Sequence, residues 1–334
     1  MRRVKIIGGG LAGLGLGIAL RRNSVPVEIR EAGHYPRHRV CGEFITSLDR
    51  HTREGLQLDD ILEAAHTARH VSWCEDGKDD IAHELPQPAL CLSRHRFDES
   101  LAEKFLRLGG ELHTGAREEC VDEPGRVHAC GRKPDPSSSW VGIKQHFHGL
   151  ETNNDLEVHF GAAGYIGVTK VENDTVNVCG LLKRGAADFT QPLAVIARQG
   201  GFARLSRRLQ DSEAVGDSFC AVAGLAYESP AADKLLHIGD RAGLIPPFTG
   251  NGMTIALQSA VAAAPALTAW AHGNSGWQET RGAATKALEH LFSNRRRFAR
   301  ILHPLILHPG ARSFARTLDR MGVLPVGLLY RMMH

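Results

Sequence analysis

The sequence has little of several features that would assign a protein to a class at once. Its 334 residues carry a net charge of only +3, so the total charge gives no sign of a nucleic-acid partner. Charged residues make up 23% and hydrophobic residues 43%, which excludes a disordered or collagen-like chain. The seven cysteines are widely spread without any Cys-x-x-Cys pair, which argues against a disulfide framework and a zinc ribbon and favours a reducing, cytoplasmic compartment.

The sequence also lacks a long uninterrupted apolar run. The longest stretch, residues 255–270, contains polar residues and Pro265 and is shorter than the roughly 20 residues of a membrane span. Two arginines and an apolar run at residues 4–20 resemble a secretory signal, but four glycines weaken such a helix and no small-x-small cleavage site follows. We therefore expect a packed cytoplasmic protein of about two domains.

A glycine-rich turn follows the first expected strand. Residues 4–7 predict a short buried strand and residues 11–22 a helix, with a Gly-x-Gly-x-x-Gly pattern between them. The first glycine of this pattern permits a tight turn, the second lets the backbone approach a pyrophosphate, and the third lets the helix pack on the strand. The N-terminus of the helix then offers N–H groups to the phosphates. The expected phosphate-binding residues are Gly8, Gly10, Leu11, Ala12 and Gly13.

An acidic residue follows the second expected strand. Residues 25–30 predict this strand, and Glu31 with the adjacent Ala32 comes 18 positions after Gly13. A carboxylate at this place accepts hydrogen bonds from the ribose hydroxyls of adenosine and repels a 2′-phosphate. The pattern therefore favours FAD or NAD over NADP at this site.

A second motif, far along the chain, favours FAD over NAD. Residues 234–238 predict a strand that ends in Gly-Asp, and a glycine-containing turn leads from there into an alanine-rich helix. An aspartate at the end of a strand can bind the ribityl chain of a flavin, and a helix N-terminus near the ring stabilises the anionic reduced form. NAD has no ribityl chain. The expected cofactor residues of this motif are Gly239, Asp240, Gly250, Asn251, Gly252 and Met253.

Together these motifs resemble the FAD-binding pattern of the p-hydroxybenzoate hydroxylase and geranylgeranyl reductase superfamily. The Pro-basic-Cys-Gly-Glu stretch at residues 36–43 is similar to a reductase loop that lies alongside the flavin ring, which adds Arg39, Cys41 and Gly42 to the cofactor residues. The Arg-x-x-Phe-Asp stretch beginning at Arg94 resembles a helix start whose arginine reaches the FAD pyrophosphate or ribityl chain. One departure is Cys130-Gly131, which stands where family members usually carry Asp-Gly.

The resemblance implies an α/β fold in which a Rossmann-type FAD-binding domain carries a mixed or antiparallel substrate-domain sheet and C-terminal helices. The FAD-binding domain is expected to comprise residues 1–70, 94–135 and 220–275, and the substrate sheet residues 71–93 and 136–219. Short β-rich segments between residues 140 and 188, separated by Gly, Asn and Asp turns, independently indicate an antiparallel sheet.

Residues 276–334 form a basic helical tail with two interpretations. Residues 286–331 contain nine Lys and Arg residues but only two acidic residues. The basic residues alternate with apolar residues at helical spacing. Such a tail could lie peripherally on an anionic membrane, or its helices could pack on the FAD-binding domain.

The catalytic groups are less evident. Cys41, Glu43 and Tyr165 are candidates near the flavin ring, each with a packing role as the alternative. His146 and His148 share a strand face, but no carboxylate or third ligand stands at a metal-binding spacing, so no metal is expected. The flavin would carry the redox chemistry.

Three functions remain open at this point. The first is an FAD-dependent monooxygenase that uses external NADPH or NADH and O₂ to hydroxylate a hydrophobic aromatic or polyketide-like molecule through a C4a-hydroperoxyflavin, as the resemblance implies. The second is an FAD-dependent reductase or dehydrogenase acting on a C=C bond of an isoprenoid-like substrate, favoured by Cys41-Gly42-Glu43. The third is a non-catalytic flavin- or lipid-binding carrier, suggested by the missing Asp-Gly motif.

Overall fold

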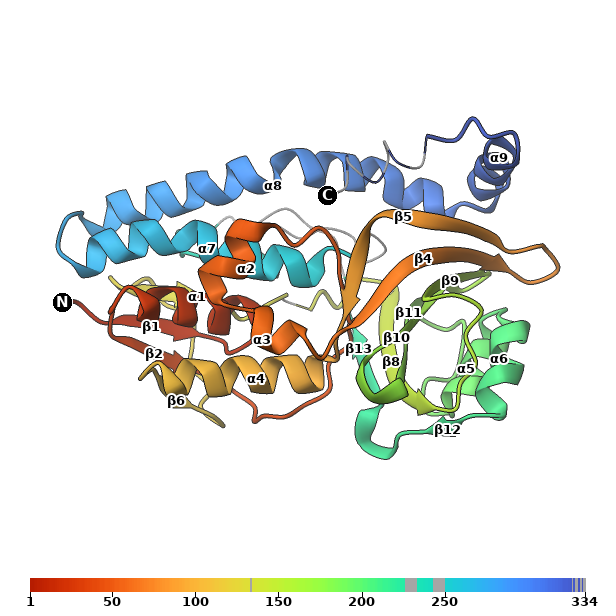
Figure 1. Cartoon of the computed structure of the whole chain (residues 1–334), viewed down its shortest axis with the longest axis horizontal. Helices are drawn as coiled ribbons and strands as arrows, with labels where there is room; N and C mark the ends of the chain where they lie inside the picture. Colours follow the sequence, from red (N-terminus) through yellow and green to blue (C-terminus); the bar gives the residue numbers. More distant parts are fainter. Residues whose placement is uncertain are drawn as a thin grey trace.

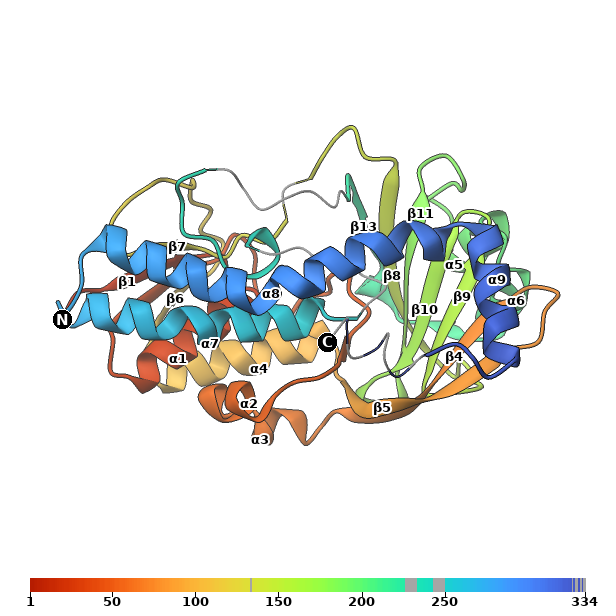
Figure 2. The same cartoon turned by 90° about the horizontal axis from the view of Figure 1, so that it is seen from above.

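The computed structural model describes residues 1–132, 134–225, 233–242, 250–325, 327, 330 and 332. Two sheets organise these residues, and a pair of long helices lies across them (Figures 1 and 2). The sheets are built by different patterns. The first uses short, buried strands with parallel pairing, and the second uses longer strands that alternate between two faces.

The first sheet is parallel and has the strand order β6-β2-β1-β7. A bridge between His128 and His237 adds the segment before Gly239 to the β7 edge. Helix α1 packs against helices α4 and α7, and its buried leucines join the apolar strand residues in one core. The elements are β1 (Val4–Ile7), α1 (Leu11–Arg22), β2 (Val27–Arg30), α2 (Arg50–Leu56), α3 (Asp59–Leu62), α4 (Arg94–Arg107), β6 (Glu111–His113), β7 (Arg126–His128), η3 (Gly239–Arg241) and α7 (Gly252–Ala271).

The second sheet is mixed and has the order β12-β8-β11-β10-β9-β4-β5-β3, with β13 also pairing with β8. All its pairs are antiparallel except β4 with β9. The predicted domain boundary between residues 70 and 71 falls inside β4. The elements are β3 (Phe44–Ile45), β4 (His66–Glu75), β5 (Ile81–Cys91), β8 (Trp140–His148), β9 (Leu156–Gly161), β10 (Gly164–Lys170), η1 (Glu172–Asp174), β11 (Val176–Lys183), α5 (Leu193–Gln199), α6 (Ala203–Gln210), β12 (Glu213–Ala214), η2 (Gly216–Ser218) and β13 (Cys220–Ala223).

The alternation of side chains gives the central strands of the mixed sheet two unlike faces. One face carries Ile143, Ile166 and Val178, which pack with the apolar residues of α5 and α6. The opposite face carries Lys144, His146 and their neighbours on β11 and β10, because successive side chains of a strand point to opposite sides. This polar face meets the segment that leads from β2 to β3, as the contacts below show. The predicted fold class is confirmed.

The C-terminal helices α8 (Trp277–Leu307) and α9 (Pro309–Arg320) pack on the rest of the chain. Helix α8 runs alongside α7 and reaches the mixed sheet, where α9 lies near the β4–β5 hairpin (Figures 1 and 2). The contacts of α9 with this hairpin are polar: Arg320 Nη2 lies 2.9 Å from Asp79 Oδ2, Asp319 Oδ2 lies 3.3 Å from His83 Nε2, and Arg316 donates to Asp79 O. In the described residues, α7 is the one helix long and apolar enough to cross a membrane, and 56% of that apolar stretch is buried within the protein.

Candidate functional site

The turn between β1 and α1 has the geometry of a dinucleotide-binding loop. A Cβ on Gly13 would lie 1.9 Å from the Gly8 carbonyl oxygen, and Gly8 itself has a φ of +107°, so side chains are excluded at both positions. In front of Gly10 the space is open, since only Arg94 Nη2 comes near, at 3.9 Å. Helix α1 has no side-chain N-cap and no acidic residue in its first turn. Its first N–H groups, those of Leu11 and Ala12 among them, therefore suit an anion at this loop.

Glu31 closes this loop at the end of β2. Its carboxylate accepts hydrogen bonds from Gly9 N at 2.7 Å and Gly33 N at 2.8 Å. Arg37 Nη2 lies 2.7 Å from Oε1, and Arg39 Nη2 lies 3.8 Å from Oε2. A ribose that binds the Glu31 carboxylate would have to share this carboxylate with Arg37 or displace the Arg37 side chain. The Arg37 side chain is partly exposed and able to move.

Arg94 connects the loop to the rest of the site. Asp98, which is fully buried, holds the guanidinium through two hydrogen bonds of 2.7 and 2.8 Å. The resulting position beside Gly10 is the one expected of an arginine that reaches the pyrophosphate. The backbone N–H of Arg94 donates to Glu43 Oε1 at 3.0 Å, so α4 begins where the phosphate loop and the Cys41–Glu43 loop meet.

The second motif converges on the same region. Gly239 packs closely on α1, because a Cβ there would lie 2.9 Å from Ala12 Cβ. At the start of α7, Asn251 Oδ1 accepts a hydrogen bond from Thr46 Oγ1 at 2.9 Å. The ring of Phe44 fills the space between Gly42 and Gly250. Gly252 and Met253 begin α7, and Asp240 lies in η3 next to Gly239. Residues 243–249 of this motif lie outside the described residues.

A buried cluster of charged and titratable groups lies where this region meets the polar face of the mixed sheet. Glu43 is fully buried, and its Oε2 lies 2.6 Å from His146 Nε2. Its Oε1 lies 3.4 Å from Nζ of the fully buried Lys144. Lys144 Nζ in turn donates to His38 Nδ1 at 2.8 Å, and the ring of His38 stacks on His95 with centroids 4.5 Å apart. We call Glu43, Lys144, His146, His38 and His95 the junction cluster.

The environment of the junction cluster sets its protonation. Burial raises the pKa of a carboxyl group, but the hydrogen bond from His146 and the charge of Lys144 outweigh this and lower the pKa of Glu43. Burial and the neighbouring Lys144 lower the pKa of His38 to about 4. At neutral pH Glu43 is therefore a carboxylate, and His38 is a neutral ring whose Nδ1 accepts a hydrogen bond from Lys144.

The other sequence candidates lie around this cluster. Cys41 accepts a hydrogen bond on Sγ from Glu43 N at 3.4 Å, and burial raises the pKa of its thiol, so it is not a reactive thiolate. Asn177 Nδ2 donates to Cys41 O at 3.0 Å, while its buried Oδ1 has no hydrogen-bond partner among the described residues. Tyr165 is buried on the same sheet face, paired with Leu181 of β11. His148 is exposed, so the two histidines of this strand do not act together.

Sequence reasoning missed four members of the site: Lys144, His38, His95 and Asn177. The alternation of residues 144, 146 and 148 on one strand was visible, and it could have included Lys144 in the polar face. The pairing of that face with Glu43, which is 103 positions from His146, was not visible without the fold.

These residues fit FAD. The loop offers closely spaced N–H groups and an arginine to a pyrophosphate, and Glu31 stands at the end of β2, where a ribose is expected. The ring of Phe44 occupies the space at Gly42 and Gly250, so a flavin ring beside these glycines would have to displace it. Among the described residues, no atom lies within 4 Å of a Cβ placed on Gly252, so the backbone there is accessible to a ligand.

Comparison with solved structures places the fold among flavoproteins. A flavin-dependent brominase superposes with a TM-score of 0.76 and 18% identity over 99% of this chain and 93% of its own. A geranylgeranyl bacteriochlorophyll reductase-like protein from Thermoplasma acidophilum has a TM-score of 0.72 and 15% identity over 95% and 90%. A flavoprotein/dehydrogenase from Cytophaga hutchinsonii has a TM-score of 0.73 and 15% identity over 99% and 93%. No family profile matches the sequence, and no curated protein matches it. The resemblance predicted from the motifs is confirmed at the level of structure: this chain has the fold of the FAD-dependent oxidoreductases.

Proposed function

We propose that the protein is an FAD-dependent monooxygenase that hydroxylates a hydrophobic aromatic or polyketide-like molecule. Two kinds of support stand behind this proposal. The fold is that of flavin-dependent oxidoreductases, and the loop, Glu31 and Arg94 suit the phosphate and ribose parts of FAD. FAD, when bound, supplies electron transfer and the activation of O₂.

The observation that carries the proposal is the junction cluster. A fully buried carboxylate is costly unless it is paired, and Glu43 is paired with two cationic or protonatable groups at the contact of the two sheets. The cluster places several titratable groups together on the polar face of the mixed sheet, and this arrangement favours a catalytic function over the non-catalytic carrier.

The cluster can hold and move a proton. His146 Nε2 and Lys144 Nζ flank the Glu43 carboxylate, so a proton given to a reacting group by either can be replaced along the hydrogen bonds. Lys144 Nζ also donates to His38 Nδ1 at 2.8 Å, and the ring of the half-buried His38 stacks on the half-buried His95. The hydrogen-bonded part of the cluster therefore extends from Glu43 through Lys144 to His38.

A second candidate is an FAD-dependent reductase or dehydrogenase acting on a C=C bond of an isoprenoid-like substrate. The Cys41-Gly42-Glu43 stretch and the similarity to a geranylgeranyl bacteriochlorophyll reductase-like protein favour it. A proton delivered to carbon by His146 or Lys144 would serve this reaction equally well. The two functions differ in the fate of oxygen, and this difference decides between them.

The experiment starts from purified protein and measures bound flavin by absorbance and by mass spectrometry of the released cofactor. The flavin is then reduced anaerobically with NADPH or NADH, and ¹⁸O₂ is admitted in the presence of a panel of aromatic, polyketide-like and prenyl compounds. One ¹⁸O atom in the product supports the monooxygenase. Reduction of a prenyl C=C bond without ¹⁸O supports the reductase, and a protein that binds no FAD contradicts both.

We propose that the C-terminal helices also allow peripheral membrane contact. Several of their apolar side chains are exposed, among them Ile301, Phe314 and Met321. Basic residues interleave with them, which suits an anionic lipid surface. Co-sedimentation with anionic and with neutral liposomes tests this, comparing the protein with an Ile301→Ser, Phe314→Ser variant. Equal recovery of both proteins in the supernatant contradicts the contact.

A further inference from the structure

A cluster of metal-ligating side chains lies behind the phosphate loop, apart from the junction cluster. Cys120, His128 and Cys130 each place one ligand atom within 4.8 Å of the others. The two sulfur atoms are 3.7 Å apart. His128 ends β7 and Cys130 follows two positions later, so the extended chain directs both side chains to one side. Cys120 arrives from the irregular segment before β7.

His237 is the candidate for a fourth ligand, and it lies next to His128 without belonging to the group of three. It pairs with His128 across the edge of the parallel sheet, and the two ring centroids are 5.6 Å apart. Two imidazoles on one tetrahedral ion would place their centroids roughly 5 Å apart, given Zn–N bonds of about 2.0–2.1 Å. The ring of His237 would have to turn toward the two sulfur atoms to complete a four-ligand site.

Both histidines have a nitrogen that the protein leaves without a partner. His128 is 1% exposed and His237 is 7% exposed, yet Nδ1 of each ring is buried and makes no hydrogen bond among the described residues. The Nε2 atoms are occupied, on Val121 O at 3.1 Å for His128 and on Asp233 Oδ1 at 2.8 Å for His237. An Nε2–H that donates to an oxygen leaves Nδ1 with its lone pair, which is the form that binds a metal. The Asp233–His237 contact also has the form of the carboxylate–histidine–metal triads in zinc proteins.

The distances and the ligand types together favour zinc. Two thiolates on a tetrahedral Zn²⁺, with Zn–S bonds of about 2.3 Å, lie roughly 3.8 Å apart, close to the separation of Cys120 and Cys130. Two thiolates and two imidazoles are a common structural ligand set for this ion, and they suit the hard cations Mg²⁺ and Ca²⁺ poorly. Both cysteines are exposed, so the ion has a path of entry.

We propose that Cys120, His128, Cys130 and His237 bind a structural Zn²⁺ ion. Residues 114–125 contain no helix or strand, and the ion would tie this segment to β7 and to the strand segment before Gly239. The site lies directly behind the phosphate loop, because a Cβ on Gly8 would lie 2.4 Å from Ala129 O. In the zinc-free protein Cys130 Sγ donates to Ile7 O at 3.3 Å, and Cys130 would give up this hydrogen bond on binding the ion as a thiolate. This inference does not depend on which flavin reaction the protein performs.

The test uses the full-length protein and measures zinc, not activity. Protein purified with a reducing agent is stripped with a chelator, reloaded with Zn²⁺ and analysed by mass spectrometry for metal content, and its affinity is measured by competition with a chromophoric chelator. Loading with Co²⁺ adds a spectroscopic readout, because thiolate-to-cobalt charge-transfer absorption reports sulfur ligands. The expected result is one ion per chain with that absorption.

The variants identify the ligands. Cys120→Ser and His237→Asn are expected to weaken zinc binding at least 100-fold, and Asp233→Asn, which only orients His237, 10- to 100-fold. Cys220→Ser and His113→Asn, which remove a thiol and an imidazole elsewhere, are the matched controls and are expected to bind zinc like the parent protein. Since Cys120 is exposed, its replacement leaves the core intact.

Three results would overturn the proposal. The first is reduced protein that takes up no zinc, with Cys120 and Cys130 found either as free thiols or as a disulfide. The second is unchanged zinc affinity in Cys120→Ser and His237→Asn. The third is zinc binding that is lost in His159→Asn and retained in these two variants, which would place the ion at Cys74, Glu157 and His159.

Discussion

Two histidine–glutamate pairs of almost equal length lie on opposite faces of the mixed sheet. His146 Nε2 is 2.6 Å from Glu43 Oε2 on the polar face, and His159 Nε2 is 2.7 Å from Glu157 Oε2 on the face that carries α5 and α6. Both glutamates are buried. What surrounds each pair differs, and this difference separates a structural contact from a candidate active site.

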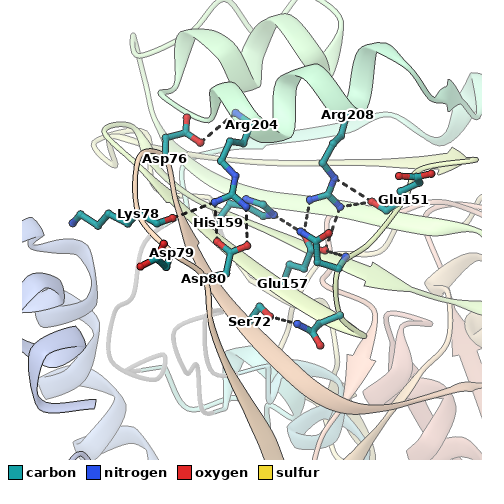
Figure 3. Close-up of polar contacts among 12 residues, drawn as sticks. Ser72, Asp76, Lys78, Asp79, Asp80, Glu151, Glu157, His159, Arg204 and Arg208 are labelled. Atoms are coloured by element: carbon teal, nitrogen blue, oxygen red, sulfur yellow. Dashed lines mark hydrogen bonds and ion pairs between the residues drawn. The ribbon is translucent and has the colours of Figure 1, made fainter. Parts of the chain in front are cut away.

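The Glu157 pair is closed by an arginine (Figure 3). Arg208 of α6 donates to both carboxylate oxygens, at 2.7 and 3.2 Å, and Asn153 N donates to Oε1 at 2.5 Å. Burial alone would raise the pKa of Glu157, but the hydrogen bonds from His159 and Arg208 outweigh it and lower this pKa to about 2. Arg208 also contacts Glu151 O, so the guanidinium fastens α6 to the sheet. The carboxylate has no capacity left for a substrate or a metal ion, although Cys74 is close.

The Glu43 pair has a lysine and a second histidine instead. Lys144 is a point charge that can exchange protons, whereas an arginine in a protein stays protonated. His38 and His95 are half-buried members of the cluster, and Glu43 lies in the segment before β3 while Lys144 and His146 lie on β8. A histidine–glutamate pair therefore contributes to stability at Glu157, where its neighbour is an arginine that stays protonated. The corresponding pair at Glu43 is suited to proton transfer, because its neighbours can titrate.

The largest expected effect is a loss of stability when the Glu157 pair is disrupted. Glu157→Gln would leave the charge of Arg208 and the ring of His159 without a carboxylate in a buried site, and we expect it to lower the free energy of unfolding by about 3 kcal/mol. Urea unfolding followed by circular dichroism measures this. The double variant Glu157→Leu, Arg208→Met removes both charges and is expected to recover part of the loss. A Glu157→Gln protein as stable as the parent would remove the distinction drawn between the two pairs.

The next prediction concerns turnover. His146→Asn keeps a hydrogen-bonding group beside Glu43 but cannot transfer a proton, so we expect product formation to slow by about 100-fold. His159→Asn makes the same replacement on the other face and is expected to keep the parent rate, within about twofold, per folded molecule. The rates are compared with the substrate found in the ¹⁸O₂ experiment, after matching flavin content. Equal rates for both variants would mean that the junction cluster does not act in the reaction.

The sequence was most informative where the chemistry is local. The turn at Gly8–Gly13 and the acid at Glu31 belong to one strand–helix–strand unit, so spacing alone predicted that they lie together, and Glu31 does accept from Gly9. This expectation depended on short-range geometry that the backbone imposes. Arg94 comes from a distant helix, and its Nη2 lies 3.9 Å from a Cβ placed on Gly10, while its contact with the pyrophosphate or ribityl chain stays a prediction.

Contacts between distant segments could not be read in this way. Glu43 meets His146 only because the loop before β3 crosses the polar face of β8, and no periodicity reports that crossing. The residues of the proposed zinc site are an intermediate case. The His128-x-Cys130 pattern is visible in the sequence, but Cys120 comes from an irregular segment and His237 from a parallel neighbour strand, so the spacing of the cysteines does not indicate the group.

The third prediction separates the two regions by pH. An unfolded histidine titrates near 6.5, whereas burial and Lys144 lower the pKa of His38 to about 4 in the folded protein. The unfolded chain therefore binds the proton first, and His38 reduces stability as the pH falls from 6.5 to 4. Glu157 has a folded pKa of about 2 against an ordinary 4.5, so its contribution is lost between pH 4.5 and 2.

Urea unfolding at several pH values tests this order. His38→Gln is expected to reduce the loss of stability between pH 6.5 and 4 by about 1 kcal/mol, a value discounted because His38 is partly exposed to solvent. Glu157→Gln is expected to flatten only the interval below pH 4.5. If His38→Gln left the upper interval unchanged, the neutral state of His38 in the junction cluster would be wrong.

The smallest expected effect concerns the stability of helix α6. Asp76, in the turn between β4 and β5, accepts from Ala203 N and, at 3.2 Å, from Arg204 N, so it caps a helix from a distant hairpin (Figure 3). Asp76→Ala leaves these N–H groups without their acceptor, and we expect a loss of about 1 kcal/mol, because water can replace part of the cap at this exposed position. Asp76→Asn, which can still accept, is the control and is expected to retain most of the stability. Because Asp76 lies on the Glu157 side of the sheet, we expect neither variant to change the reaction rate per folded molecule. A slower reaction in Asp76→Ala would show that the position of α6 affects the junction cluster on the other face of the sheet.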